Sequence, residues 1–155
     1  MRILVTWIFN LSVAIMSLPA QAQFPFEAGS VRLLVKPKLL RNQLGSLCVS
    51  LFSSPEGFPS SGERALYSGC YKIEELNENP EIVINNLNTG SYAIALFHDE
   101  NSDGQLNTGV FGIPMEGFGF SNNPKIKFSA PKYAECQIQL SDAQSTQSIE
   151  LRYFL

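Results

Sequence analysis

Short segments in which apolar and polar residues alternate restrict the fold of this chain more than any other feature. Clusters of Gly, Pro, Asn and Ser separate these segments. A period of two puts alternate side chains on opposite faces of a β-strand, so that one face is dry and the other wet. Many short strands between turn residues predict an all-β sandwich. The apolar positions are Val31, Leu33 and Val35; Leu47, Val49 and Leu51; Ile82 and Ile84; and Ile149, Leu151 and Tyr153.

The segment SYAIALF, Ser91 to Phe97, differs from these because it is apolar on both faces. Small alanines alternate with bulky Tyr, Ile and Leu side chains. A strand covered on both faces lies inside a sheet, so we expect this segment to be the central strand. Helix is scarce, and we expect one or two short helical turns, at Ser61–Leu66 and at Pro131–Glu135, where proline suits the first helical position.

The first 22 residues have the layout of a secretory signal peptide. Arg2 precedes a charge-free, mostly apolar run from Ile3 to Met16, and a small-x-small site follows at Ala20 to Ala22. An N-terminal membrane anchor is the alternative, but the run is shorter than the ~20 residues that a spanning helix needs. We therefore expect residues 1–22 to be a cleaved signal peptide, residues 23–155 to form one domain, and the product to be secreted or periplasmic.

The charge of the expected mature chain is mildly acidic. Removal of residues 1–22 takes away Arg2 and no acidic residue, so the 11 basic and 14 acidic side chains become 10 and 14, a net charge of −4. The chain has no basic stripe and no interleaved arginine and aromatic pattern. We expect no nucleic-acid partner. No segment after the signal peptide is long and apolar enough to cross a membrane.

Three cysteines remain after cleavage, Cys48, Cys70 and Cys136, in a compartment that favours disulfides. Their spacing fits no zinc site, and the chain has only one histidine. We favour a disulfide between Cys48 and Cys70, because each lies in or beside a predicted strand and a connecting loop separates them. The other two pairings stay open. Cys136 alternates with Ile138 and Leu140, which predicts a buried thiol on an apolar face.

The central strand also carries a recognisable motif. LNTGSYAIALFHD resembles the L-x-x-G-x-Y pattern of transthyretin-like and carboxypeptidase-regulatory-like sandwich domains, which commonly serve as binding or spacer modules. Three longer stretches resemble a family of uncharacterised secreted bacterial proteins known as DUF2141: LCVSLFSSPEGFPS, LNTGSYAIALFHDENSDGQLN and FGIPMEGFGFSNNPKIKFSAPKYAE. The resemblance covers the chain from about Val31 onward. It implies a small immunoglobulin-like or transthyretin-like antiparallel β-sandwich outside the cytoplasm, and it brings no catalytic residues.

The stretch HDENSDGQLN, from His98 to Asn107, matches the start of a calcium-binding loop. Calcium prefers six to eight oxygen ligands, and the pattern D-x-[DN]-x-[DN]-G supplies them from its first, third and fifth positions. Asp99, Asn101 and Asp103 occupy these positions, and Gly104 occupies that of the glycine.

Further ligands come from the rest of the loop. The carbonyl of Gln105 and the side chain of Asn107 occupy the seventh and ninth positions, but Val110 stands where an EF-hand has a bidentate glutamate. Glu116 is the substitute that can fold back, whereas Glu100 points away in this register. The sequence predicts a weak site, with a dissociation constant of about 10⁻⁴ to 10⁻³ M. A hairpin tip whose Asp and Asn side chains cap backbone amides is an equal alternative.

His98 raises the question of catalysis. A catalytic histidine would pair with Asp99 and with a serine such as Ser121. Adjacent strand residues point to opposite faces, so Asp99 is badly placed to orient His98. We expect a hydrogen-bonded structural histidine and assign no residue a catalytic role.

The segment GVFGIPMEGFGFSNNP mixes glycines with Phe111, Phe118 and Phe120. One interpretation is an aromatic patch that binds a carbohydrate or a hydrophobic partner. We favour rings that pack onto the sandwich, with glycines that permit tight turns.

The sequence as a whole favours a secreted or periplasmic, non-enzymatic β-sandwich module that binds a protein or glycan partner, with calcium at one loop. The alternative is a small extracytoplasmic hydrolase that uses the loop carboxylates, which requires them to converge in a pocket.

Overall fold

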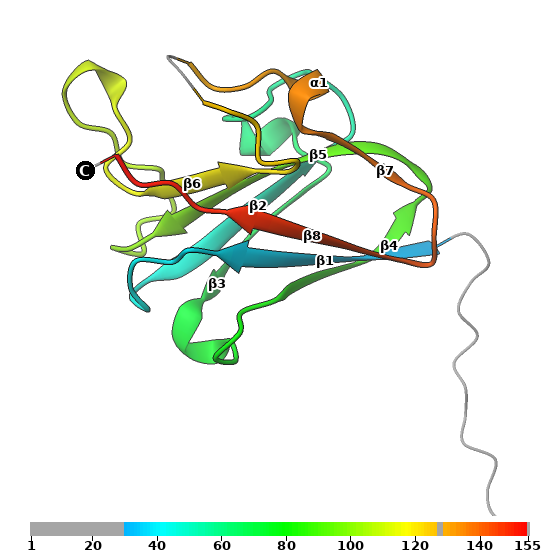
Figure 1. The fold of residues 1–155 in the computed structure, drawn as a ribbon, viewed down its shortest axis with the longest axis horizontal. Helices are drawn as coiled ribbons and strands as arrows, with labels where there is room; N and C mark the ends of the chain where they lie inside the picture. Colours follow the sequence, from blue (N-terminus) through cyan, green and yellow to red (C-terminus); the bar gives the residue numbers. More distant parts are fainter. Residues whose placement is uncertain (1–29, 127–128, 155) are drawn as a thin grey trace, which may run out of the picture.

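The computed structural model describes residues 30–126 and 129–154, which fold into two β-sheets packed against each other (Figure 1). The expected all-β architecture is confirmed. The predicted signal peptide, residues 1–22, lies outside the described residues.

The larger sheet has five strands and positions every candidate site. Its members are β2 (Ser46–Phe52), β3 (Tyr67–Lys72), β5 (Gly90–Asp99), β6 (Gly117–Phe120) and β7 (Gln137–Leu140). Strand β5 is central, as expected, with β2 on one side and both β6 and β7 on the other. Residues 95–98 of β5 pair with β6 and residues 90–93 pair with β7, so these two short strands follow one another along one edge of β5.

The smaller sheet holds β1 (Ser30–Lys38) between β4 (Ile82–Asn88) and β8 (Gln144–Glu150). Strand β4 is antiparallel to β1, but β8 is parallel to it, so the sandwich is not antiparallel throughout. Strand β8 follows β7, which lies in the larger sheet, so the chain crosses between the sheets before β8 begins. Because β8 does not follow β1 in a hairpin, it can pair with β1 in the parallel direction. Strand β8 begins at Gln144, earlier than the alternation of the C-terminal residues suggests. The alternation did not mark this start, because the first four residues of the strand are polar.

The core between the sheets consists of the residues that the period of two places inward. Val31, Leu33 and Val35 of β1 face Leu47, Val49 and Leu51 of β2 in one buried cluster. The intervening Arg32 of β1 is exposed. Burial of this apolar surface stabilises the fold by about 25 cal/mol per Å².

A second apolar cluster covers part of the other face of the five-stranded sheet. It contains Phe52, Phe118, Phe120 and Tyr133, with the thiol of Cys136. Tyr133 and Cys136 come from α1 (Tyr133–Cys136), close to the helical turn expected at Pro131–Glu135. The other expected turn is η1 (Gly62–Arg64). Two further turns, η2 (Ile73–Glu75) and η3 (Val110–Gly112), were not expected.

The glycines of β6 have a role that the sequence did not indicate. Gly117 and Gly119 lie inside a buried strand, so the expected role in tight turns is wrong for both. A Cβ on Gly119 would lie 2.6 Å from the backbone oxygen of Glu150, and one on Gly117 would overlap the ring of Tyr153. Glycine is needed here because the C-terminal segment packs directly on the backbone of β6.

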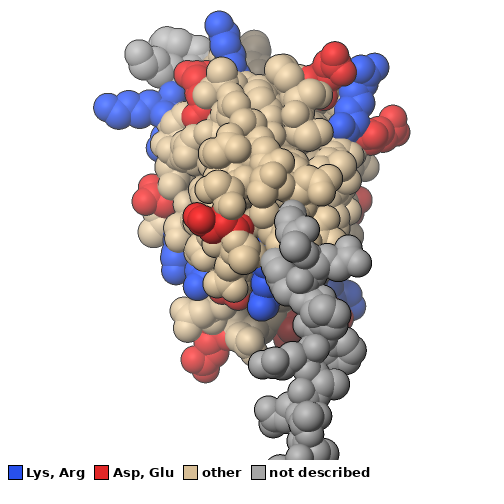
Figure 2. Space-filling view, turned by 90° about the vertical axis from the view of Figure 1, so that its right-hand side faces the viewer, with Lys and Arg blue, Asp and Glu red and all other residues tan. Residues whose placement is uncertain are grey.

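Charged side chains of both signs lie around the face of the molecule that Figure 2 shows. Figure 2, which shows the right-hand side of Figure 1, has an uncharged centre with Lys, Arg, Asp and Glu side chains interspersed around it. Within residues 30–126 and 129–154, no helix has both the length and the apolar character needed to cross a membrane.

Candidate functional site

A disulfide joins the two strands at one edge of the larger sheet. Cys48 of β2 and Cys70 of β3 are direct cross-strand neighbours, and their sulfur atoms are 1.99 Å apart. This is the pairing that the sequence favoured. Cys136 is a buried free cysteine, also as expected, and burial raises the pKa of its thiol to about 12.

The outward face of the larger sheet carries two rows of side chains that run across four strands. One row is Cys70, Cys48, Phe97 and Phe118, and the other is Ser68, Ser50, Ala95 and Phe120. These side chains point away from the main core, because Leu96 and Val49 of the same strands point into it. Phe97, Ala95 and Ser50 are only partly covered.

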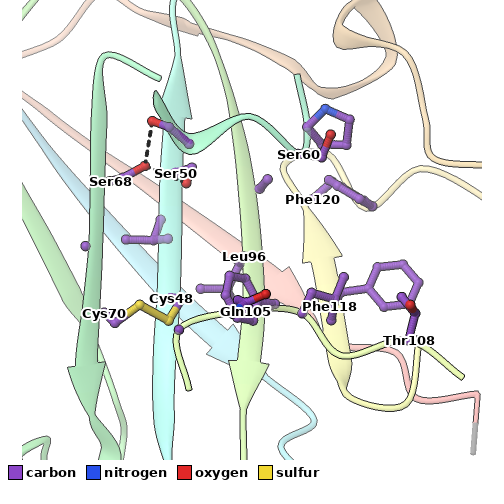
Figure 3. A pocket seen from close by; sticks show the side chains of 18 residues that line it. Cys48, Ser50, Ser60, Ser68, Cys70, Leu96, Gln105, Thr108, Phe118 and Phe120 are labelled. Carbon is purple, nitrogen blue, oxygen red and sulfur yellow. Dashed lines mark hydrogen bonds between the residues drawn. A yellow bond between two sulfur atoms is a disulfide. The ribbon is translucent and has the colours of Figure 1, made fainter. Parts of the chain in front are cut away.

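Two loops border these rows and form a groove between them. One loop contributes Pro59, Ser60 and Gly62, and the other contributes Gly104 to Leu106 and Thr108. Figure 3 shows Gln105 and Thr108 at one side of the groove and Ser60 at the other, with the disulfide at the β3 end. We call this cavity of about 580 Å³ the outer-face groove. None of its lining residues is charged, and its volume lies in the range of small-ligand sites.

The loop after β5, which holds the predicted metal ligands, is built on Asp99. The Asp99 carboxylate is 1% exposed and accepts hydrogen bonds from the backbone N–H groups of Asp103 (3.1 Å) and Gly104 (2.8 Å). Gly104 has a φ of +78°, which the tight turn requires and which glycine adopts without strain. Asp99 therefore fixes the loop that forms one wall of the groove.

Glu116 folds back onto this loop, as the sequence reasoning allowed. Its carboxylate is 5% exposed and accepts hydrogen bonds from the backbone N–H groups of Glu100 (2.9 Å) and Asn107 (2.8 Å). Glu116 thus ties the two ends of the loop together. Each of its oxygens retains a second lone pair, and the same is true of Asp99.

Three of the predicted ligands converge at the exposed tip. The Asn101 and Asn107 side-chain amides donate to Asp103 Oδ2 at 3.0 and 2.9 Å. The hydrogen bond from Asn107 is the largest of the contacts that lower the pKa of Asp103, followed by that from the Gln105 N–H. These contacts are those of a capped hairpin tip, and a cation would have to replace the two amide groups at Asp103.

The acidic residues alone do not form a metal centre. Among the described residues, no group of three or more His, Cys, Asp or Glu side chains is placed to hold a metal ion. Calcium would therefore need oxygens from Asn101, Asn107 and the Gln105 carbonyl in addition to carboxylates. Carbonyl and amide oxygens are ordinary calcium ligands, so the donor set fits the ion chemically.

Glu100 turns away from the loop, as expected from its register, and enters a different cluster. Arg41 donates to both Glu100 oxygens, from Nε at 2.8 Å and from Nη2 at 2.5 Å. This hydrogen bond lowers the pKa of Glu100 and raises that of Arg41. The Arg41 guanidinium also lies 4.6 Å from the centre of the Tyr153 ring. No sequence pattern indicated this cluster, which joins the β1–β2 loop, the end of β5 and the C-terminal segment.

His98 belongs to the same region, and both of its ring nitrogens have hydrogen-bonding partners. It is fully buried, with Nδ1 2.8 Å from the Tyr153 hydroxyl and Nε2 2.7 Å from the Leu44 carbonyl oxygen. Ser121 is also buried. Its hydroxyl accepts from the Ile94 N–H and donates to the Cys136 carbonyl, which bridges the gap between β6 and β7. His98 and Ser121 therefore have separate hydrogen-bonding partners.

The segment between Asn107 and Glu116 departs from expectation. We call residues Gly109 to Met115 the apolar loop. Phe118 and Phe120 pack on the sheet as expected, but Phe111 is 96% exposed, so the expectation that its ring packs there is wrong. Phe111 also has a φ of 62°, which is unusual for a bulky side chain.

Comparison with known proteins places the chain in a family. A family model described as an uncharacterized protein conserved in bacteria (DUF2141) matches residues 35–148. No curated protein matches the sequence. One solved structure, a fimbrial assembly protein from Parabacteroides distasonis ATCC 8503, aligns over 79% of this chain and 52% of its own length, with 9% identity and a TM-score of 0.41. The chain thus spans about half the length of that protein.

Proposed function

The chain belongs to the DUF2141 family, and we propose that it is an extracytoplasmic, non-enzymatic β-sandwich module that binds a protein partner in the outer-face groove. The observation that carries this proposal is an uncharged, partly aromatic groove on the outward face of four hydrogen-bonded strands. Partly covered apolar residues at its floor, Ala95 and Phe97, are available to a partner. Apolar surface enclosed by a polar rim is typical of binding sites.

The groove rests on a rigid base. Strands β3, β2, β5 and β6 lie side by side, and the Cys48–Cys70 disulfide closes the β3 end. Three inter-strand spacings of about 4.8 Å give a length of about 14 Å. An extended peptide rises about 3.3 Å per residue, so roughly four residues span this distance. We propose an uncharged segment with one or two apolar side chains as the bound element.

The polar groups of the groove favour a protein over a glycan. Sugar hydroxyls need many hydrogen-bonding partners, but the Ser50 and Ser68 hydroxyls already bond each other at 2.7 Å, and Ser68 also donates to the Gly62 carbonyl at 3.3 Å. The remaining polar groups, on Ser60, Gln105 and Thr108, lie at the rim. Apolar side chains therefore match the floor better than sugar hydroxyls do.

We also propose that calcium stabilises the loop that walls the groove. The ligands are Asp99, Asn101, Asp103, Asn107, Glu116 and the Gln105 carbonyl oxygen. Convergence of Asn101, Asn107 and Asp103 supports the proposal, as does the return of Glu116 to the loop. Because Gln105 and Leu106 line the groove, calcium would stiffen one wall of the binding site.

Thermal melts with calcium and with a chelator test the metal proposal. For a dissociation constant of about 0.1 to 1 mM, 10 mM calcium stabilises the fold by roughly 1.4 to 2.7 kcal/mol, or about 5 to 10 °C. Asp103→Ala should abolish this increase. Asp142→Ala, at an exposed position in the turn between β7 and β8, should retain it. A wild-type melt that calcium leaves unchanged would show that the loop is a capped hairpin tip.

Export is the remaining part of the proposal. The disulfide supports an oxidising compartment, and the layout of residues 1–22 supports cleavage before Gln23. N-terminal sequencing of protein from the producing bacterium should begin at or near Gln23. A product that retains Met1 and sediments with membranes would contradict it.

Peptide selection tests the groove. A display library panned on the protein should yield uncharged peptides with apolar residues. Ala95→Leu fills the floor of the groove and should weaken their binding at least tenfold. Thr146→Leu, an exposed position on β8 of the other sheet, should leave it unchanged. Equal loss in both variants, or equal binding to Ala95→Leu and wild type, would overturn the proposal. Glycan-array binding that Ala95→Leu abolishes would assign the groove to a glycan instead.

A further inference from the structure

We propose that a second copy of this chain is a partner of the groove, with the apolar loop of each copy seated in the outer-face groove of the other. This inference rests on the proposed function, because it names an occupant of the same groove. The apolar loop is the most exposed apolar segment among the described residues.

The apolar loop presents its side chains to solvent from an ordered backbone. Phe111 is 96% exposed and Val110 is 74% exposed, and Ile113 and Met115 are also exposed. Hydrogen bonds from Gly109 N to Ile113 O (2.8 Å) and from Met115 N to Asn107 O (2.9 Å) hold the loop. A loop fixed in advance loses little conformational entropy on binding, which favours association.

The backbone conformation of Phe111 also favours burial of this residue against a partner. A φ of 62° is unusual for a bulky residue and is energetically unfavourable. In the isolated chain this cost brings no packing in return, because the ring contacts solvent over almost its whole surface. Burial of an aromatic side chain against a partner would offset it.

Charge favours a copy of the same chain at this surface. The full sequence has a net charge of −3, so two copies repel each other unless their contact surfaces are uncharged. No residue from Gly109 to Met115 is charged, and neither is any residue that lines the groove. Charged side chains nearby, such as Arg41 and Glu100, bond each other.

The positions of loop and groove suit a symmetric dimer. Thr108 lines the groove and directly precedes the apolar loop, so the two features are adjacent on one side of the molecule. A two-fold axis requires that when the loop of one copy contacts the groove of the other, the reverse contact also forms. Adjacent features meet this requirement in one compact interface.

The buried area indicates a weak dimer. Two Phe111 rings bury about 300 to 500 Å², and Val110, Ile113 and the groove rims must supply the remainder of the roughly 1,000 Å² that a specific interface needs. We therefore expect a dissociation constant in the micromolar range.

Sedimentation equilibrium of residues 23–155, from about 1 µM to 1 mM, measures this association. Wild type should dimerise. Phe111→Ser removes a ring from both reciprocal contacts, so it should weaken the dimer by at least about 30-fold, the loss typical of a single aromatic anchor. Leu66→Ser, at a residue that is 56% exposed and lies outside both loop and groove, should change nothing. A monomer throughout the range, or equal effects of the two variants, would overturn the inference.

Mixing experiments test reciprocity. Ala95→Leu blocks the groove but keeps the loop, and Phe111→Ser does the opposite, so a mixture of the two should associate more strongly than either alone. Ser60→Arg, at an exposed rim position, replaces Ala95→Leu if that variant unfolds. A mixture that associates no more strongly than either variant alone would refute the reciprocal contact.

Two other outcomes would assign the loop or the groove to a different partner. Flotation of monomeric wild type, but not Phe111→Ser, with phosphatidylglycerol vesicles would assign the loop to a lipid surface and overturn the inference. Peptide binding in the groove without self-association would overturn this inference and leave the proposed function intact.

Discussion

Reduction of the Cys48–Cys70 disulfide should destabilise the protein by an amount that follows from the topology. The bond joins residues separated by 22 positions, from β2 across the loop and η1 to β3. In the chain-entropy model, a cross-link over a loop of this length stabilises the fold by about 3 kcal/mol at 25 °C, because it restricts the unfolded chain. For a domain of this size that corresponds to a fall in melting temperature of roughly 10 °C.

Circular dichroism melts with and without a non-thiol reductant measure this change without altering any side chain. The control is Cys136→Ala, which removes the buried free thiol, so that any effect of the reductant must come from the Cys48–Cys70 pair. The Cys48→Ala, Cys70→Ala double variant should melt near the reduced wild type and should not respond to reductant. A shift below about 2 °C in wild type, or one that disappears in Cys136→Ala, would refute the reasoning.

Three further predictions follow from the contacts of particular residues. Glu100→Gln should lower the free energy of unfolding by about 1 kcal/mol at pH 7, a modest loss because the ion pair with Arg41 is partly exposed. The pair holds the pKa of Glu100 below its usual 4.5. The deficit should therefore persist above pH 4.5 and disappear as the pH falls from 4.5 through the lower pKa of the folded state. The thiol of Cys136, with its pKa raised to about 12, should resist alkylation at pH 8 until denaturant unfolds the chain, and rapid labelling of native protein would contradict this. Gly119→Ala should destabilise by about 1 to 3 kcal/mol in denaturant melts, since its methyl would meet a backbone carbonyl at 2.6 Å. Gly109→Ala should be tolerated, because the nearest atom to its methyl would be in the Met115 side chain at 3.5 Å.

The sequence predicts those parts of the fold in which burial controls residue type. Alternation located the inward faces of β1 and β2, and the two-sided apolar character of β5 identified it as central. It did not predict the start of β8, because Gln144 to Gln147 are polar and only their hydrogen bonds to β1 make them a strand. The strand character of β6 was missed for a related reason: glycine has low strand propensity, and its requirement here comes from distant residues.

The candidate site was partly predictable. Spacing in HDENSDGQLN indicated a sharp turn at Gly104, and this glycine has a φ of +78° in the loop. The groove was missed, although one signal was present: Ala95 and Phe97 lie on the second apolar face of the central strand, so something had to cover them. The Arg41–Glu100 cluster could not be found, since its members are 59 residues apart and no periodic pattern relates them.

Site-specific photo-crosslinking in the producing bacterium tests the central proposal, that the outer-face groove binds a protein. A photoreactive amino acid at Gln105, on one wall of the groove, should give a discrete protein adduct, and the same probe at Thr146, on the other sheet, should not. Combining the Gln105 probe with Ala95→Leu should remove the adduct, and an adduct of twice the mass of the chain would identify a second copy as the partner. The absence of any adduct at Gln105, or the same adducts at Gln105 and Thr146, would contradict the proposed function.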